Sequence, residues 1–230
     1  MSTSSLSSTV LRVFIVRHGE TAENVAGIIQ GQMDTVLNDE GLLQSRTCAE
    51  ALKNIDFTIA FSSDLKRAAI LAHHPNTQLH TDDQLRERNM GELQGAKVGT
   101  YDRHKLPASV ETAEHFVRRA LGWWKKTIER NLPSLLIQPR PVNVLVISHG
   151  AFIATLCREL LHGKMIEPAQ GVGLGRGTCF NTSITVIGMR RDKHGTLERY
   201  ADISHLLRPV VRTNADEEPQ EDQVEVDRQL

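Results

Sequence analysis

Cysteine is scarce in this sequence of 230 residues. Only Cys48, Cys157 and Cys179 occur, no two of them form a CxxC pair, and each lies in an apolar or small-residue context. An odd number of cysteines without paired spacing argues against a disulfide framework or a cysteine zinc site. We therefore expect structural thiols in a protein of a reducing compartment.

An excess of charge of one sign is also absent. The chain has 27 Lys and Arg residues against 28 Asp and Glu residues, which gives a formal net charge of −1. This balance gives no indication of a nucleic acid or a membrane surface as a partner. With 40% hydrophobic and 24% charged residues, the composition is ordinary for a globular protein.

Long apolar runs are lacking as well. No stretch approaches the roughly 18 residues that a membrane-spanning helix needs, and the N-terminal MSTSSLSST lacks the basic and apolar layout of a signal peptide. These absences predict a cytoplasmic protein, with a nuclear pool left open. The length predicts one domain over residues 10–207, preceded by a Ser/Thr-rich disordered tail (residues 1–9) and followed by an acidic tail without aromatic residues (residues 208–230).

What the sequence does contain is a short apolar run that ends in reactive residues. Residues 11–16, LRVFIV, are typical of a strand buried on both faces, and Arg17, His18 and Gly19 follow directly. Arginine suits bidentate capture of an oxyanion, and histidine can act as nucleophile, base or acid near neutral pH. Because ligands bind beyond the carboxyl ends of strands in open α/β sheets, this string predicts a functional site.

Two further segments repeat this arrangement. The apolar strand at residues 142–147 ends in Ser148, His149 and Gly150, and the strand at residues 57–61 leads into a helix whose first turn holds Arg67. A helix N-terminus favours anions, so Arg67 lies where a phosphate would be stabilised. Taken alone, His149 could equally be a core histidine with satisfied hydrogen bonds.

A polar loop over residues 85–95 supplies a carboxylate. Its sequence, LRERNMGELQG, is too polar and too rich in glycine for a core element. Glu87 is the candidate acid and base, and Glu92 is a second candidate. Without further context, Glu87 could also belong to a surface ion-pair cluster with Arg86 and Arg88.

The remaining pattern alternates strands with helices. Strands are expected at residues 11–16, 57–61, 78–80, 142–147, 182–189 and 197–201, the last two as paired edge strands. Helices are expected at residues 39–52 (capped by Asn38 or Asp39), 110–130 and 151–161. A glycine-rich loop is expected at residues 164–177. This order predicts an α/β fold, a three-layer sandwich in which helices flank a mainly parallel sheet. The site is expected at the carboxyl ends of the strands at residues 11–16 and 142–147.

The string RHGETAEN at residues 17–24 resembles the signature of the histidine phosphatase superfamily, in its phosphoglycerate mutase-like branch. The strings FSSDL (residues 61–65), LRERNMGELQG (85–95) and SHGA (148–151) resemble further segments of that family, in the same order. The resemblance covers nearly all of residues 11–207 and implies the phosphoglycerate mutase-like fold.

The resemblance also implies roles for individual residues. His18 would be the phosphorylated nucleophile and Glu87 the acid and base. The groups expected around the phosphate and substrate are Arg17, Asn24, Gln30, Gly31, Arg67, His149 and Gly150. The residues show no metal-binding motif such as HExxH or a Cys/His cluster, so we expect neither a metal nor a cofactor.

The implied activity is hydrolysis of a phosphorylated small molecule through a phosphohistidine. The segment over residues 95–111 is short and lacks the paired arginines that mutases carry there; only Arg119 remains nearby, and Val110 stands where the family string has a glycine. An open site admits water, which favours a phosphatase. The segments look most like the TIGAR-like, broad-specificity phosphatases of sugar phosphates or bisphosphates such as fructose 2,6-bisphosphate. A phosphoglycerate mutase, or a regulatory protein on the same scaffold, stays open, and the sequence indicates no oligomeric state.

Overall fold

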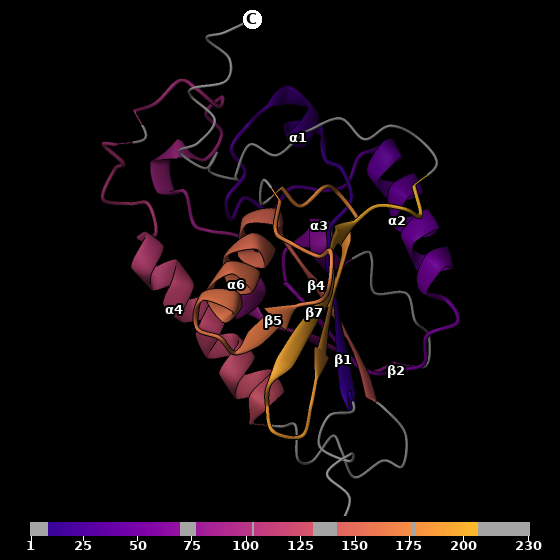
Figure 1. The fold of residues 1–230 in the computed structure, drawn as a ribbon. Coiled ribbons are helices and arrows are strands. Elements are labelled where there is room, and N and C mark those ends of the chain that lie inside the picture. Colours follow the sequence, from indigo (N-terminus) through magenta and orange to yellow (C-terminus); the bar gives the residue numbers. More distant parts are fainter. Residues whose placement is uncertain (1–8, 70–76, 103, 131–141, 176–177, 207–230) are drawn as a thin grey trace, which may run out of the picture.

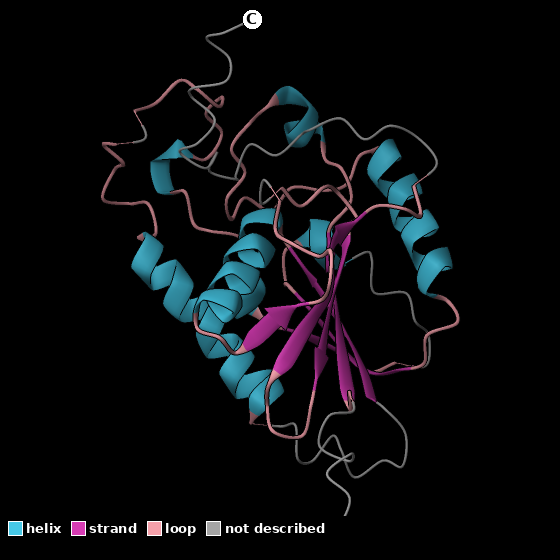
Figure 2. Cartoon of the chain, viewed as in Figure 1, coloured by secondary structure: helices cyan, strands magenta, loops and turns pink. Residues whose placement is uncertain are grey.

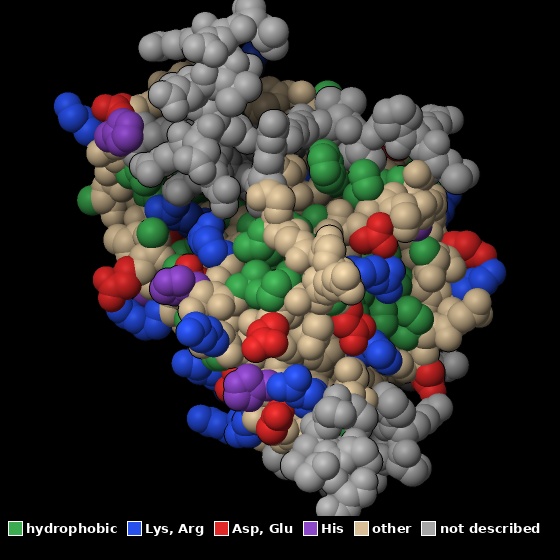
Figure 3. Space-filling model, viewed as in Figure 1, with side chains coloured by type: hydrophobic (Ala, Val, Ile, Leu, Met, Phe, Trp, Pro, Cys, Tyr) green, Lys and Arg blue, Asp and Glu red, His purple; other side chains and the backbone are tan. Residues whose placement is uncertain are grey.

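The computed structural model describes residues 9–69, 77–102, 104–130, 142–175 and 178–206. The predicted tails therefore lie almost entirely outside the described residues. Within these ranges no helix is long and apolar enough to cross a membrane. On the face drawn in Figure 3, acidic and basic side chains are interspersed, as the near-zero net charge suggests.

One sheet organises the described chain (Figures 1 and 2). Its strands are β1 (Leu11–Arg17), β2 (Phe57–Ser62), β3 (Leu79–Thr81), β4 (Val142–Ser148), β5 (Ile166–Pro168), β6 (Ile184–Met189) and β7 (Gly195–Asp202). In space they follow the order β3-β2-β4-β1-β6-β7-β5. Among these strands β6 alone runs against the others, since its pairings with β1 and β7 are antiparallel and the remaining pairings are parallel. The predicted α/β fold with a mainly parallel sheet is confirmed.

Helices cover both faces of this sheet. They are α1 (Ala22–Ala26), α2 (Asp39–Leu52), α3 (Lys66–Ala69), α4 (Ala113–Trp123) with its π-helical continuation η4 (Trp124–Glu129), α6 (Gly150–His162) and the short 3₁₀ helices η2 (Asp83–Leu85) and η3 (Gly91–Leu93). In Figure 1, α4 and α6 lie on one side of the sheet and α2 on the other, which gives the three layers.

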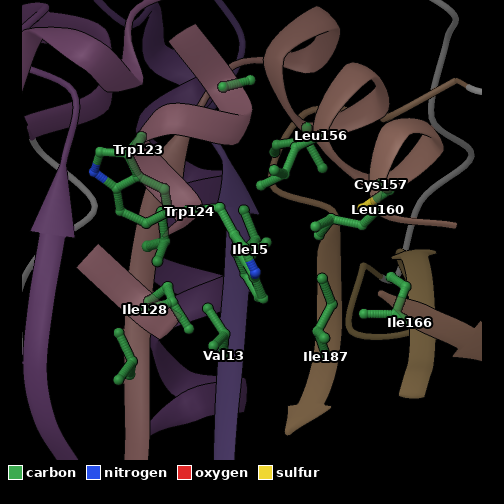
Figure 4. Packing of buried hydrophobic residues seen from close by; sticks show 14 of the residues in the cluster. Val13, Ile15, Trp123, Trp124, Ile128, Leu156, Cys157, Leu160, Ile166 and Ile187 are labelled. Carbon is green, nitrogen blue, oxygen red and sulfur yellow. The ribbon is translucent and has the colours of Figure 1, made fainter. Parts of the chain in front are cut away.

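The pleat of the central strand explains why its sequence is apolar without interruption. Val13 and Ile15 point into the core beneath α4 and α6, where Figure 4 shows them beside Trp124. Phe14 and Val16 point to the opposite core beneath α2. Successive side chains alternate between faces, so β1, which is covered on both sides, is buried at every position except Arg12.

Side-chain caps fix where the helices begin. Asn38 accepts a hydrogen bond from the backbone N–H of Gly41 at 2.8 Å, which confirms it as the N-cap of α2. Thr112 caps α4 in the same way through the N–H of His115 at 3.2 Å. The expected helix start at residue 110 was therefore wrong by three residues, because Val110 belongs to the buried loop that precedes this cap.

The part of the sheet formed by β5, β6 and β7 differs from the expectation in two respects. The strands predicted near residues 182–189 and 197–201 do form an antiparallel pair, β6 and β7, but β6 lies inside the sheet between β1 and β7. The predicted glycine-rich loop at residues 164–177 contains β5, which pairs with β7 and forms the edge. A three-residue strand within a glycine-rich segment carries no periodic signal, so only its partner reveals it.

The three cysteines are free and buried, as expected. Burial raises the pKa of the Cys48 and Cys157 thiols to about 12. Both therefore stay protonated near neutral pH and pack as small apolar groups.

Candidate active site

Parallel pairing of β1 with β4 brings two distant histidines together. Arg17 is the register partner of Ser148, so His18 and His149 emerge side by side at the carboxyl edge of the sheet. Their ring centroids lie 5.1 Å apart with planes inclined at 58°. Both side chains are buried, at 3% and 0% exposure. The two histidines therefore meet at the carboxyl ends of β1 and β4, where the site was expected.

The imidazole of His18 is held in one tautomer. Its Nδ1 lies 2.7 Å from the carbonyl oxygen of Gly19. A carbonyl oxygen only accepts, so Nδ1 carries the proton and Nε2 keeps its lone pair. The carbonyl oxygen of His18 in turn accepts from the Asn181 side chain at 3.1 Å and from the Thr182 N–H at 3.2 Å. This geometry leaves Nε2 as the nucleophilic atom.

His149 has the complementary arrangement. Its Nε2 lies 2.9 Å from the hydroxyl of Ser63, and that hydroxyl also accepts from the N–H of Leu65 at 3.4 Å. A hydroxyl donates once and accepts twice; when Ser63 donates to Nε2, Nδ1 of His149 carries the proton. Among the described residues this buried Nδ1 has no hydrogen-bond partner. It is a donor available to an oxyanion.

Two buried guanidinium groups flank the histidines. Arg17, 1% exposed, donates from Nη1 to the Cys179 carbonyl at 2.6 Å, while its buried Nε has no hydrogen-bond partner within the described part of the chain. Arg67, fully buried, donates to the carbonyls of Met33 at 2.6 Å and Gly31 at 2.7 Å. Backbone carbonyls orient these two cations without neutralising their charge.

The surroundings keep both imidazoles neutral. Burial is the main cause that lowers the pKa of His18 well below its ordinary value, and the charges of Arg67 and Arg17 lower it further. Burial likewise lowers the pKa of His149, followed by Arg67. Near pH 7 the site therefore combines an unprotonated nucleophilic nitrogen with two permanent positive charges.

The carboxylate of Glu87 lies at the start of α6. It is 2% exposed, and its two oxygens accept from the N–H of Arg88 at 2.8 Å and of Ala151 at 3.0 Å. Gly150, the first residue of α6 and the chain neighbour of Ala151, is also buried. Glu92 is exposed, and its carboxylate contacts the Ser109 hydroxyl. Glu87 is thus joined to the helix that follows His149, whereas Glu92 faces solvent.

The loop residues expected to bind substrate also make contacts that support the site. Oδ1 of Asn24 accepts from the backbone and hydroxyl of Thr21, each at 3.2 Å, and from Asn181 at 3.3 Å. Oε1 of Gln30 accepts from Thr21 at 3.0 Å. The Gly31 carbonyl accepts from the Arg67 guanidinium. These contacts fix the turn after β1 and orient the second arginine.

Ser63, Asn181 and Thr182 complete the site, and the sequence interpretation gave them no catalytic role. Nothing local in the sequence connects Ser63 to His149, because the two residues are 86 positions apart. Asn181 and Thr182 carried no signal at all, although Thr182 has a φ of +57°, which is rare for a threonine. Among the described residues, no group of three or more His, Cys, Asp or Glu side chains is placed to hold a metal ion.

The sequence of this chain is similar to those of known proteins. A family model described as the histidine phosphatase superfamily (branch 1) matches residues 13–203. A protein of Schizosaccharomyces pombe named a probable phosphatase is 31% identical over 206 residues, which cover 85% of this chain and 95% of the relative.

Solved structures share the fold. The crystal structure of phosphoglycerate mutase from Bacillus anthracis str. Sterne matches with a TM-score of 0.68 and 27% identity, covering 87% of this chain and 96% of that one. Phosphoserine phosphatase from Entamoeba histolytica, solved with 3-phosphoglyceric acid, matches with a TM-score of 0.64 over 86% of this chain and 100% of that one. At 23% identity the second likeness concerns the fold alone.

Proposed function

Because the chain belongs to the histidine phosphatase superfamily (branch 1), we propose that it is a phosphatase that hydrolyses phosphomonoesters through a phosphohistidine on His18. The observation that carries this proposal is the pair of buried donors, Nε of Arg17 and Nδ1 of His149, that lack a partner among the described residues. Buried donors without partners are costly unless a ligand satisfies them. A phosphoryl group is an anion that would do so beside a neutral nucleophile.

In the first step Nε2 of His18 attacks the phosphorus in line with the leaving oxygen. The N–P bond forms as the P–O bond breaks, and Glu87 gives its proton to the departing alkoxide. Arg17, Arg67 and the Nδ1–H of His149 stabilise the negative charge on the equatorial oxygens. The leaving alcohol then diffuses away.

In the second step water attacks the phosphohistidine. The Glu87 carboxylate takes a proton from that water as its oxygen bonds to phosphorus and the N–P bond breaks. Inorganic phosphate leaves, His18 returns to its neutral form, and Glu87 is again protonated. Two displacements of this kind need only the residues of this chain and water, so we predict that neither a metal nor a cofactor is required.

A phosphatase is favoured over a mutase because the arginines beside the site are already paired with carboxylates. A cavity of about 450 Å³ adjoins the loop that carries Glu87. The two arginines that line it are already paired, Arg86 with Asp64 at 2.6 Å and Arg119 with Glu111 at 2.8 Å. Neutral hydrogen-bonding groups, among them Gln32, Gln84, Asn89 and Ser109, make up much of its lining. Such groups suit hydroxyls, which supports sugar phosphates as substrates.

The name of one relative supports hydrolysis as the activity, and the buried thiols support the cytoplasm as the location. The 31% identical relative that the chain covers to 95% is named a probable phosphatase, whereas the 27% identical structure is named a phosphoglycerate mutase. Three free, buried cysteines suit a reducing compartment, which favours the cytoplasm.

Trapping the covalent intermediate tests the mechanism. Rapid quench with ³²P-labelled sugar phosphate should give an acid-labile, base-stable label on the peptide that contains His18, with an early burst of alcohol release. His18→Ala should be inactive, and His194→Ala, at an exposed histidine, should behave as wild type. A His18→Ala protein that retains a tenth or more of wild-type kcat would exclude the covalent route. Transfer of the label to a second substrate instead of water would identify a mutase.

A further inference from the structure

We propose that Arg119 and Glu111 form a positioning pair that holds the Glu87 loop in register with α6 and thereby sets kcat without touching the substrate. The inference rests on the proposed function only in assigning Glu87 the acid and base role.

Arg119 engages all of its hydrogen-bond donors. Nη1 donates to the carbonyls of Gln84 at 2.8 Å and Arg86 at 2.7 Å, and Nη2 donates to the carbonyl of Glu87 at 3.1 Å. Nε and Nη2 also donate to the Glu111 carboxylate, at 3.0 and 2.8 Å. A guanidinium has five N–H donors, so the five contacts leave none for a substrate phosphate or carboxylate.

Glu111 binds the same loop from its other end. Its carboxylate accepts from the N–H of Asn89 at 3.0 Å in addition to Arg119, and its side chain is 6% exposed. Burial by itself would raise the pKa of Glu111, but the hydrogen bonds from Arg119 and Asn89 outweigh burial and lower it. The carboxylate therefore stays ionised and binds both the arginine and the loop.

The pair is anchored to the rigid part of the fold. The Arg119 guanidinium carbon lies 4.9 Å from the ring centroid of Phe116, one turn earlier on α4. Phe116 packs in turn against Phe152 of α6, with ring centroids 6.3 Å apart. Since the Glu87 carboxylate accepts from Ala151 of α6, helices α4 and α6 hold the loop from two sides.

This arrangement explains how a residue outside the reaction centre would control it. Without Arg119, the carbonyls of Gln84, Arg86 and Glu87 lose a donor that comes from one rigid plane. The Gln32 side chain would still bind the Glu87 carbonyl and the Ser148 hydroxyl the Leu85 carbonyl, but the link through Arg119 to α4 would be lost. A displacement of about 1 Å at an acid and base can cost on the order of 100-fold in rate.

A double-mutant cycle with Glu87 separates positioning from simple stabilisation. Arg119→Ala and Glu111→Gln should each lower kcat on an alkyl or sugar phosphate by about 10- to 100-fold, with KM changed less than about threefold. On p-nitrophenyl phosphate, whose leaving group needs little acid, the loss should be slight. Because the arginine acts through the acid, adding Arg119→Ala to Glu87→Gln should cause no further loss.

Matched variants make each outcome decisive. Arg118→Ala removes the neighbouring arginine, whose pairing with Glu114 is exposed, and should leave kcat unchanged. If Arg119→Ala does not fold, Arg119→Lys, which keeps the charge but loses the fork, should show the same selective loss of kcat. Additive losses in the cycle, or a rise in KM at constant kcat, would overturn the inference. If Glu87→Gln itself is without effect, the proposed function fails instead.

Discussion

Replacing Glu87 by glutamine changes one oxygen of a buried carboxylate into an NH₂ group. The carboxylate accepts from two backbone N–H groups, those of Arg88 at 2.8 Å and Ala151 at 3.0 Å. The amide of glutamine has one acceptor oxygen, so one of these donors will face another donor. The variant therefore removes the proton that the reaction needs and also one hydrogen bond near the start of α6.

The size of both effects follows from these contacts. A buried donor that loses its acceptor costs about 1–3 kcal/mol in the free energy of unfolding. At about 2–4 °C per kcal/mol for a domain of this size, the melting temperature should fall by roughly 2–12 °C. Loss of general acid and base help should lower kcat on alkyl or sugar phosphates by about 10²–10⁴-fold. On p-nitrophenyl phosphate the loss of acid help should be much smaller.

The assay compares two substrates within one protein preparation. The ratio of kcat on glycerol phosphate to kcat on p-nitrophenyl phosphate cancels any change in the folded fraction, which the melting temperature reports separately. Glu92→Gln is the matched control, because Glu92 is exposed and surface changes usually shift stability by about 0.5 kcal/mol or less. If Glu87→Gln hydrolyses glycerol phosphate normally and Glu92→Gln does not, the two glutamates must exchange roles.

Further predictions concern metal, pH and backbone. Activity should persist in EDTA; loss that Mg²⁺ restores would contradict the cationic-pocket mechanism. The melting temperature should fall from pH 7 towards pH 5, since burial lowers the pKa of His18 and His149 and the unfolded chain binds more protons below about pH 6.5; replacing both by glutamine should flatten this dependence. Gly31→Ala should destabilise by about 1–2 kcal/mol or more in urea unfolding, because φ is +48° and a Cβ would lie 2.5 Å from a neighbouring oxygen; Gly27→Ala, at φ +66° in open space, should cost less.

Local patterns in the sequence determined much of the fold. The uninterrupted apolar runs that became β1 and β4 predicted buried parallel strands, and Asn38 predicted the start of α2. These features are set by neighbours in the chain, through burial of alternate side chains and through capping bonds a few residues long. The same reasoning singled out His18 and His149, which follow strands directly, and Arg67, which lies in the short helix after a strand.

Contacts between distant residues were decided only by tertiary structure. The sequence does not show that Ser63 forms a hydrogen bond with His149, that Asn181 and Thr182 bind the carbonyl of His18, or that β5 forms the edge of the sheet. It also leaves Arg119 looking like a free cation, whereas its five donors are engaged. Each such contact depends on the register and packing of elements far apart in the chain, and a hydrogen bond fixed by geometry leaves no periodicity or composition to read.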